Sequence, residues 1–263
     1  MFETYAVTEA APGRPNEDFY LVSEEWLIIL DGVAPTPGQA NGCTHGVRWF
    51  VNHLGADLAT SLSTASDGAP LEQLLAEAIG RTATQHGPEC DLSTPLTPAA
   101  TVGIVRQTST SIDWLVLGDV TVAWLSKDNM PGSVTDDRLE HLPNAPIVVS
   151  DVRRYDPEFV MKVRNQPGGF WVAASEPHAA NEALTGSFAL ADIDTIGLFT
   201  DGLSRLAERY GRSWLDIFAL ADSKGMRSLV ADVRAAEIAD PEPTRWRGKT
   251  HDDATGIIWR RLG

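Results

Sequence analysis

Two apolar runs that each end in Asp-Gly constrain this chain more than any other feature of its sequence. Residues 26–30 run into a pair that begins at Asp31, and residues 196–200 lead to a second pair that begins at Asp201. A single Asp-Gly pair is usually a turn, because glycine accepts positive φ angles and aspartate bonds its own backbone. Two pairs, each at the end of a buried strand, predict two carboxylates delivered to one edge of a sheet.

Composition limits the classes of function that fit. The chain has 263 residues, of which 43% are hydrophobic, and a formal net charge of -15. A core of this size needs no disulfides, and the acidic surface argues against binding of nucleic acid or of an anionic membrane. We see no signal peptide and no apolar run of the roughly 20 residues that a spanning helix needs. We therefore expect a soluble, cytoplasmic protein.

The two cysteines, Cys43 and Cys90, lie far apart in the sequence. We expect neither a metal-binding pair nor a disulfide framework from them, but two free structural thiols. The histidine nearest to the Asp31 motif is His45. We interpret it as a solvated residue at the start of a helix, with a leaving-group acid as the alternative.

Hydrophobic periodicity predicts the fold class. Apolar residues recur at helical spacing over residues 44–63 and 71–86. The period then changes to two, which predicts three successive strands, at residues 99–105, 111–117 and 120–125. We expect a tight turn at Gly118 and Asp119 between the last two. Strands flanked by pairs of helices indicate an α+β protein, a four-layer α-β-β-α sandwich with two central, mostly antiparallel sheets.

The second half of the chain is harder to interpret. We expect a short strand at residues 134–139, a helix within residues 151–165 and a strand at 168–172, all in or near a proline-rich stretch. Three further helices are expected at residues 203–210, 214–221 and 223–238, followed by a final strand after Asp252. We expect residues 1–263 to form a single domain, with a variable, flap-like segment at about residues 143–193.

Five carboxylates stand beside apolar strands: Asp18, Asp31, Asp119, Asp201 and Asp252. Clustered carboxylates repel one another and need a cation, and oxygen ligands without His or Cys select Mg²⁺, Mn²⁺ or Ca²⁺. Two such ions, roughly 3.5–4 Å apart, can bind a phosphate and generate hydroxide at neutral pH. The alternative is that each residue only closes a turn or caps a helix, as Asp201 and Asp119 could.

Six short motifs follow one another along the chain, at residues 14–18, 30–33, 100–101, 117–119, 199–203 and 252–255. They resemble, in the same order, the motifs of the metal-dependent Ser/Thr protein phosphatases of type 2C. The chain looks like a compact bacterial member of that family. The resemblance implies the α-β-β-α sandwich already expected, with metal ions in a cleft at one end of the sheets.

The resemblance also implies roles for individual residues. It implies two Mg²⁺ or Mn²⁺ ions and a third, weaker ion, with ligands from Asp18, Asp31, the Gly32 carbonyl, Asp119, Asp201 and Asp252. Glu17 and Asp253 would not bind the ions directly but would hold these ligands or their metal-bound waters in place. Arg14 would bind the substrate phosphate and would be catalytic together with Asp31. The implied reaction is direct attack of a metal-bridging hydroxide on a phosphate monoester, without a phosphoenzyme.

The sequence departs from the family pattern at several positions. Residues 34–37 are Ala-Pro-Thr-Pro instead of a second glycine pair, and Val33 stands where some members have a histidine. Arg14 is one residue closer to the Glu-Asp pair than in most relatives. We expect substrate choice to lie in residues 34–43 and 143–193.

Three functions fit these observations. The first is hydrolysis of phosphoserine and phosphothreonine in proteins. The second is the same chemistry on a small phosphorylated metabolite, suggested by the unusual loop after Asp31. The third, a non-catalytic binding module on the same fold, is disfavoured because no metal carboxylate is lost. The sequence does not predict an oligomeric state.

Overall fold

Two five-stranded antiparallel sheets pack face to face in the computed structural model, which describes residues 1–33, 41–143, 145–149 and 153–262. Sheet A has the order β1-β12-β11-β6-β7, with β1 (Phe2–Glu9), β12 (Ala254–Arg261), β11 (Ile193–Phe199), β6 (Thr121–Ser126) and β7 (Pro131–Val134). Sheet B has the order β10-β5-β4-β3-β2, with β10 (Leu184–Ala189), β5 (Ser111–Leu117), β4 (Ala99–Gln107), β3 (Trp26–Val33) and β2 (Phe19–Val22).

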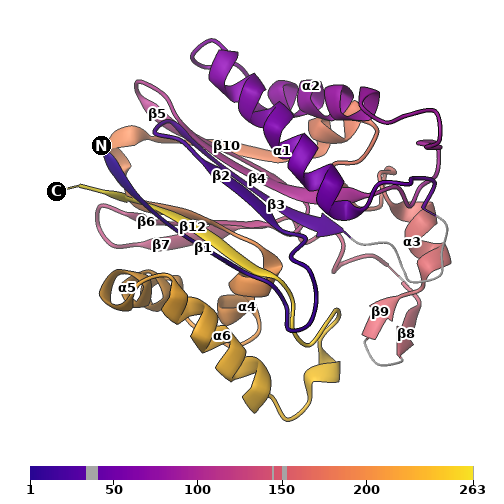
Figure 1. The fold of residues 1–263 in the computed structure, drawn as a ribbon. Coiled ribbons are helices and arrows are strands. Elements are labelled where there is room, and N and C mark those ends of the chain that lie inside the picture. Colours follow the sequence, from indigo (N-terminus) through magenta and orange to yellow (C-terminus); the bar gives the residue numbers. More distant parts are fainter. Residues whose placement is uncertain (34–40, 144, 150–152, 263) are drawn as a thin grey trace.

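Helices cover both outer faces of this pair of sheets (Figure 1). Sheet B is covered by α1 (Val47–Thr64) and α2 (Leu71–Thr84). Sheet A is covered by α4 (Asp201–Glu208), α5 (Trp214–Lys224) and α6 (Arg227–Ala239). The predicted α-β-β-α sandwich is confirmed, although the described helices on sheet A are a trio and not a pair.

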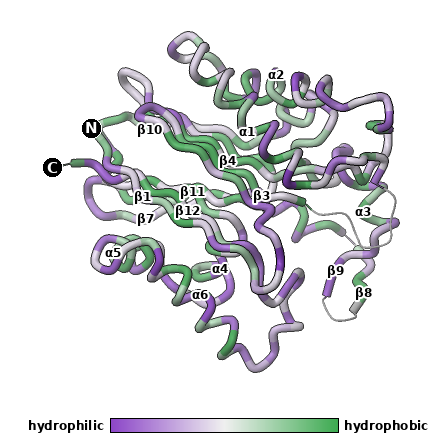
Figure 2. Tube along the Cα trace, in the orientation of Figure 1, coloured by the Kyte–Doolittle hydropathy of each residue, from purple (hydrophilic) through white to green (hydrophobic). Residues whose placement is uncertain are grey.

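The inner faces of the two sheets form a dry core. Its side chains come from both sheets and include Leu27, Ile29, Leu198 and Ile257, all fully buried. Figure 2 shows that hydrophobic residues concentrate in the central strands. At Gly103 of β4, a Cβ atom would lie 2.7 Å from Val120 Cγ1 and 2.9 Å from Leu198 Cδ2. Glycine at this position therefore lets the sheets approach closely.

The expected tight turn at Gly118 and Asp119 is wrong in one respect. β5 pairs with β4 and β10 in sheet B, whereas β6 pairs with β11 and β7 in sheet A. The segment is therefore a crossover between sheets and does not close a hairpin. Gly118 has φ of +81°, which favours glycine. The crossover places Asp119 where the two sheets meet.

Residues 143–193 differ most from the sequence prediction. The expected helix is shorter, α3 (Pro157–Val163), and follows a small hairpin of β8 (Ile147–Val149) and β9 (Arg153–Tyr155). The Asp156 side chain caps the helix, because it accepts hydrogen bonds from the backbone amides of Glu158 and Phe159. The expected strand at 168–172 forms only isolated bridges, and β7 ends where the expected strand at 134–139 would begin.

Short 3-10 helices complete the described elements, at Pro177–Glu182, Leu190–Asp192 and Pro243–Arg245. Across the residues that the structure describes, every helix is too short or too polar to cross a membrane.

Candidate metal centre

Four of the predicted carboxylates line one cavity of about 300 Å³. Asp31 lies near the end of β3, Asp119 in the crossover between the sheets, Asp201 at the first position of α4 and Asp252 just before β12. Strands of both sheets end here, so residues that are distant in sequence meet at one edge of the sandwich. Gly32 also lines the cavity. A Cβ at Gly32 would lie 2.6 Å from the Glu17 carbonyl oxygen, so the chain is tightly packed there.

Asp18 joins the same group from the start of β2. Its Oδ2 atom accepts hydrogen bonds from the hydroxyl groups of Thr200, at 3.0 Å, and Thr255, at 2.6 Å. Both threonines belong to the sheet A side of the sandwich, so Asp18 ties the two sheets together beside the cavity. Its second carboxylate oxygen has no such hydroxyl partner among the bonds described.

Asp253 does not point into the cavity but holds the loop that carries Glu17 and Asp18. Its Oδ1 atom accepts from the Ala11 amide at 2.7 Å, and its Oδ2 atom accepts from the Glu17 amide at 2.8 Å. Asp253 is buried, and two charge-assisted bonds of this kind hold a loop firmly. Asp253 thus connects the start of β12 to the segment that leads to Asp18.

Burial and mutual repulsion raise the pKa values of most of these carboxyls. Burial is the largest cause in each case, and it raises the pKa of Asp18 to about 8 and that of Asp119 to about 7. The pKa of Asp31 is raised well above its usual value by burial and then by Asp18, Asp201 and its other carboxylate neighbours. Without a cation, these groups hold protons at pH values where an ordinary aspartate is ionised.

Asp201 and Asp252 differ because positive side chains face them. Although burial acts to raise it, the guanidinium groups of Arg205 and Arg209 hold the pKa of Asp201 below its usual value. Their Nη2 atoms lie 3.4 and 3.8 Å from Asp201 Oδ2. Lys249 Nζ lies 2.9 Å from Asp252 Oδ1. Burial and the neighbouring Asp201 nevertheless raise the pKa of Asp252.

A buried charge network fixes these cations from behind. The side chain of Glu237 in α6 is fully buried and accepts bonds from Arg205 at 2.8 Å and from Arg234 at 3.0 Å. Arg234 also donates to the Asp252 carbonyl at 2.8 Å. A buried charge with this many partners resists movement. The network therefore holds both Asp201 and the backbone of Asp252 in position.

Arg14 is not among the residues that line this cavity. It is exposed in the turn that precedes Glu17, and its charge acts on that glutamate. Three cations that the sequence analysis did not select line the cavity: Arg154, Arg247 and Lys249. Arg247 stacks over Tyr155 with its guanidinium carbon 4.9 Å from the ring centre. For Arg247 and Lys249, the sequence signal is the basic character of the loop before Asp252.

The loop after Asp31 holds a second correction. Residues 34–40, where substrate choice was expected, lie outside the described residues. Beyond them, Cys43 and Cys90 are not isolated thiols: their Sγ atoms are 3.5 Å apart. The ring of His45, expected to be solvated, stacks on Trp49 and lies beside both cysteines. Sequence analysis missed this cluster because each half lies on a different loop.

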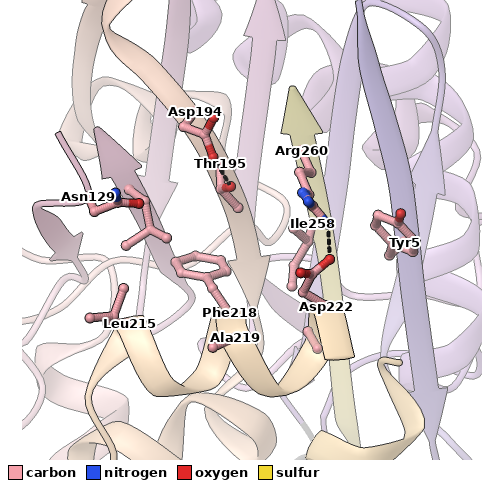
Figure 3. Close-up of a pocket in the computed structure, with 12 residues that line it drawn as sticks. Tyr5, Asn129, Asp194, Thr195, Leu215, Phe218, Ala219, Asp222, Ile258 and Arg260 are labelled. Carbon is pink, nitrogen blue, oxygen red and sulfur yellow. Dashed lines mark hydrogen bonds and ion pairs between the residues drawn. The ribbon is translucent and has the colours of Figure 1, made fainter. Parts of the chain in front are cut away.

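A second pocket, between α5 and sheet A, has a different character (Figure 3). Apolar side chains such as Phe218 form much of its wall, and its charged residues Arg260 and Asp222 pair with each other. Thr195 donates to the Asp194 carboxylate at 3.0 Å. The charged groups of this second pocket are thus already paired with neighbours.

Comparisons with known proteins agree with this geometry. The family model for protein phosphatase 2C matches residues 8–234. A search of curated protein sequences found no match. Among solved structures, the serine/threonine phosphatase PstP/Ppp of Mycobacterium tuberculosis superposes with a TM-score of 0.62 at 14% identity, over 100% of this chain and 99% of that chain.

Three further structures show the same fold. The phosphatase Stp1 of Staphylococcus aureus has a TM-score of 0.61 at 12% identity and covers 100% of this chain and 96% of its own. A sex-determining protein of C. elegans has a TM-score of 0.61 at 12% identity over 98% of this chain, which spans only 64% of that longer chain. The catalytic domain of PstP, solved with two manganese ions, is 16% identical, with a TM-score of 0.61 and coverage of 100% and 99%.

The raised pKa values predict an unusual pH dependence of stability in the metal-free protein. Between about pH 6 and about pH 8 the unfolded aspartates are ionised, whereas native Asp18 and Asp119 still bind protons. The native state therefore binds more protons, and the free energy of unfolding should fall by about 4 kcal/mol as the pH rises. The lowered pKa of Asp201 acts only below its ordinary value, outside this window.

Urea denaturation of chelator-treated protein at several pH values measures this slope. Asp119→Asn should flatten it, and Asp67→Asn, a change at an exposed loop residue, should not. A metal-free stability that stays level or increases from about pH 6 to about pH 8 would contradict the assignment of protonated carboxyls.

Proposed function

The chain belongs to the protein phosphatase 2C family of metal-dependent phosphatases, and we propose that it removes phosphate from phosphoserine and phosphothreonine in proteins. The observation that carries the proposal is the convergence of carboxylates from both sheets on one cavity that is also lined by cations. Carboxylates would hold divalent ions there, and the cations would hold the phosphate. We propose a cytoplasmic location for this activity.

The residues present fit Mg²⁺ or Mn²⁺. The ligand set consists of oxygens, which these hard cations prefer, and the carboxylates are close enough to raise each other's pKa. The buried hydroxyl of Thr101, opposite Asp31 in the β-ladder, has no hydrogen-bond partner among the described residues. A hydrated cation would neutralise the carboxylates, and its water would offer the Thr101 hydroxyl a hydrogen-bond partner.

We propose that two ions bind, with a third, weaker ion at Asp119. The protein ligands would be Asp18, Asp31, the Gly32 carbonyl, Asp119, Asp201 and Asp252. When bound, such ions supply Lewis acidity and a water of lowered pKa near the phosphorus atom. Glu17 and Asp253 would keep the ligand loop in place through the bonds already described.

The chain's own cations would position the phosphate. We propose that Arg247 and Lys249 contact its oxygens, because both line the cavity and a guanidinium can bind two oxygens at once. Lys249 would move from its bond with Asp252 toward the substrate. Arg14 stays a prediction as a phosphate ligand, and its exposed position beside Glu17 makes it the less direct candidate.

Substrate preference would come from the segment at residues 143–193, which we propose as the flap of a single domain. This segment supplies a largely apolar wall of the cavity, with side chains from Tyr155, Val160, Phe170 and Trp171. An apolar wall beside a phosphate site would contact the aliphatic part of a phosphorylated side chain and the residues next to it in a peptide. A second candidate substrate is a small phosphorylated metabolite, because the cavity volume of about 300 Å³ is also at the lower end of small-molecule sites.

Replacement of one ligand tests the metal chemistry. Asp201→Asn should lower Mn²⁺-dependent hydrolysis of p-nitrophenyl phosphate roughly 100-fold, because a neutral amide binds a divalent ion weakly and leaves Arg205 and Arg209 without their carboxylate. Asp67→Asn, at an exposed position, is the matched control. Full activity in Asp201→Asn, or activity that a chelator does not change, would refute the metal assignment.

Competing substrates test the preference. We expect kcat/KM to be higher on phosphoserine and phosphothreonine peptides than on a panel of phosphorylated sugars, nucleotides and amino acids. A Phe170→Ala variant should reduce the ratio of kcat/KM on the peptides to kcat/KM on the metabolites, because Phe170 belongs to the apolar wall. A clear preference for one metabolite would replace the protein substrate with that alternative and leave the metal site unaffected.

A further inference from the structure

A second group of potential metal ligands lies on the sheet B side of the molecule. One ligand atom from each of four residues, Cys43, His45, His86 and Cys90, lies within 4.8 Å of every other. Two of these residues come from the loop before α1 and two from the loop after α2. We propose that this cluster is a structural Zn²⁺ site that joins the two loops. The proposal does not depend on the phosphatase activity.

The distances within the cluster match a tetrahedron around zinc. Bond lengths of about 2.3 Å to sulfur and about 2.0–2.1 Å to nitrogen place neighbouring ligand atoms about 3.3–3.8 Å apart. Cys43 Sγ lies 3.5 Å from His45 Nδ1 and 3.5 Å from His86 Nδ1. Cys90 Sγ lies 3.4 Å from His45 Nδ1 and 3.5 Å from Cys43 Sγ. Four of the six edges therefore have the expected length.

The chemistry of the ligands selects zinc and distinguishes this site from the carboxylate cavity. Two thiolates and two imidazoles in a tetrahedron are typical of structural zinc, whereas Mg²⁺ and Mn²⁺ prefer oxygen. Four protein ligands leave no open position for a substrate or a water. The site would therefore stabilise the fold and would not take part in catalysis.

Hydrogen-bond donors lie close to both sulfur atoms. The His45 backbone amide donates to Cys43 Sγ at 3.3 Å, and the Thr44 hydroxyl lies 3.7 Å from Cys90 Sγ. Such donors around ligand atoms orient them and tune their charge. The Trp49 ring stacks on His45 with 4.1 Å between centres and meets His86 edge-on at 4.6 Å. The indole thus shields one side of the cluster from water.

The backbone around the cluster is built for close approach. The Asp91 amide donates to the Gly42 carbonyl, which connects the two loops directly. Gly42 has φ of +69°, and a Cβ there would lie 2.3 Å from the Asp91 carbonyl oxygen. Only glycine fits this contact, so the loops meet independently of any sulfur chemistry. A bound zinc ion would then hold the loop before α1 in contact with the loop after α2.

A disulfide is the competing interpretation of the two cysteines. Both are free thiols with sulfurs 3.5 Å apart, well beyond the bond length of about 2.05 Å. A disulfide would leave both histidines without a role, although their ring nitrogens point at the sulfurs. The geometry therefore favours a shared cation over a bond between the cysteines.

Zinc content tests the proposal directly. The protein, purified without chelator, incubated with Zn²⁺ and dialysed, should hold about one zinc per chain by elemental mass spectrometry. The double variant Cys43→Ser/Cys90→Ser should hold none. His53→Gln is the matched control, because His53 also stacks on Trp49, at 3.9 Å, but its ring nitrogen bonds the Trp49 carbonyl. It should keep the zinc, as should Asp252→Asn, which alters only the carboxylate cavity.

A spectroscopic measurement covers the case in which the double variant does not fold. Co²⁺ bound to the unmodified protein should show thiolate-to-cobalt charge transfer and the strong visible bands of a tetrahedral site, and Zn²⁺ should abolish both. Removal of zinc should also lower Tm. Absence of retained zinc, equal zinc in the double variant, cobalt spectra without thiolate bands, or a Cys43–Cys90 disulfide in freshly isolated protein would each overturn the proposal.

Discussion

Repulsion among buried carboxylates is the constraint on which the catalytic end of this molecule depends. Asp18, Asp31 and Asp119 are drawn together from different strands, and burial with mutual repulsion raises all three pKa values. A group of buried carboxylates is stable only if a bound cation or bound protons neutralise its negative charge. The fold must therefore hold the group rigidly, and the proposed divalent ions would provide the compensation.

The rest of the sandwich supplies that rigidity. The sheets meet across an apolar core that tolerates no side chain at Gly103, and Asp18 bonds hydroxyl groups that belong to the opposite sheet. Behind the cavity, Arg205 and Glu237 connect α4 to α6 with both side chains almost fully buried. The carboxylates are thus fixed from both sheets and from one helical layer, which is the pre-organisation that metal catalysis needs.

The sequence predicts those features of the fold and of the site that depend on residues close together in the chain. A strand followed by Asp-Gly can be recognised within a few residues, so Asp31 and Asp201 were found, and hydrophobic periodicity gave the layers. The prediction failed where the outcome depends on long-range pairing. Alternation cannot say which sheet a strand joins, so the crossover at Asp119 was mistaken for a hairpin. Lys249 and the Cys43 cluster needed contacts between distant loops, which no local pattern encodes.

Calorimetric titration of the chelator-treated protein with Mn²⁺ at about pH 7, in buffers of different ionisation enthalpy, tests the central claim most directly. Metal ligands must be deprotonated to bind, and the raised pKa values of Asp18, Asp31 and Asp119 mean that native carboxyls still hold protons there. We expect Mn²⁺ binding with release of about one proton or more per chain. Binding without proton release, or no binding, would contradict this expectation.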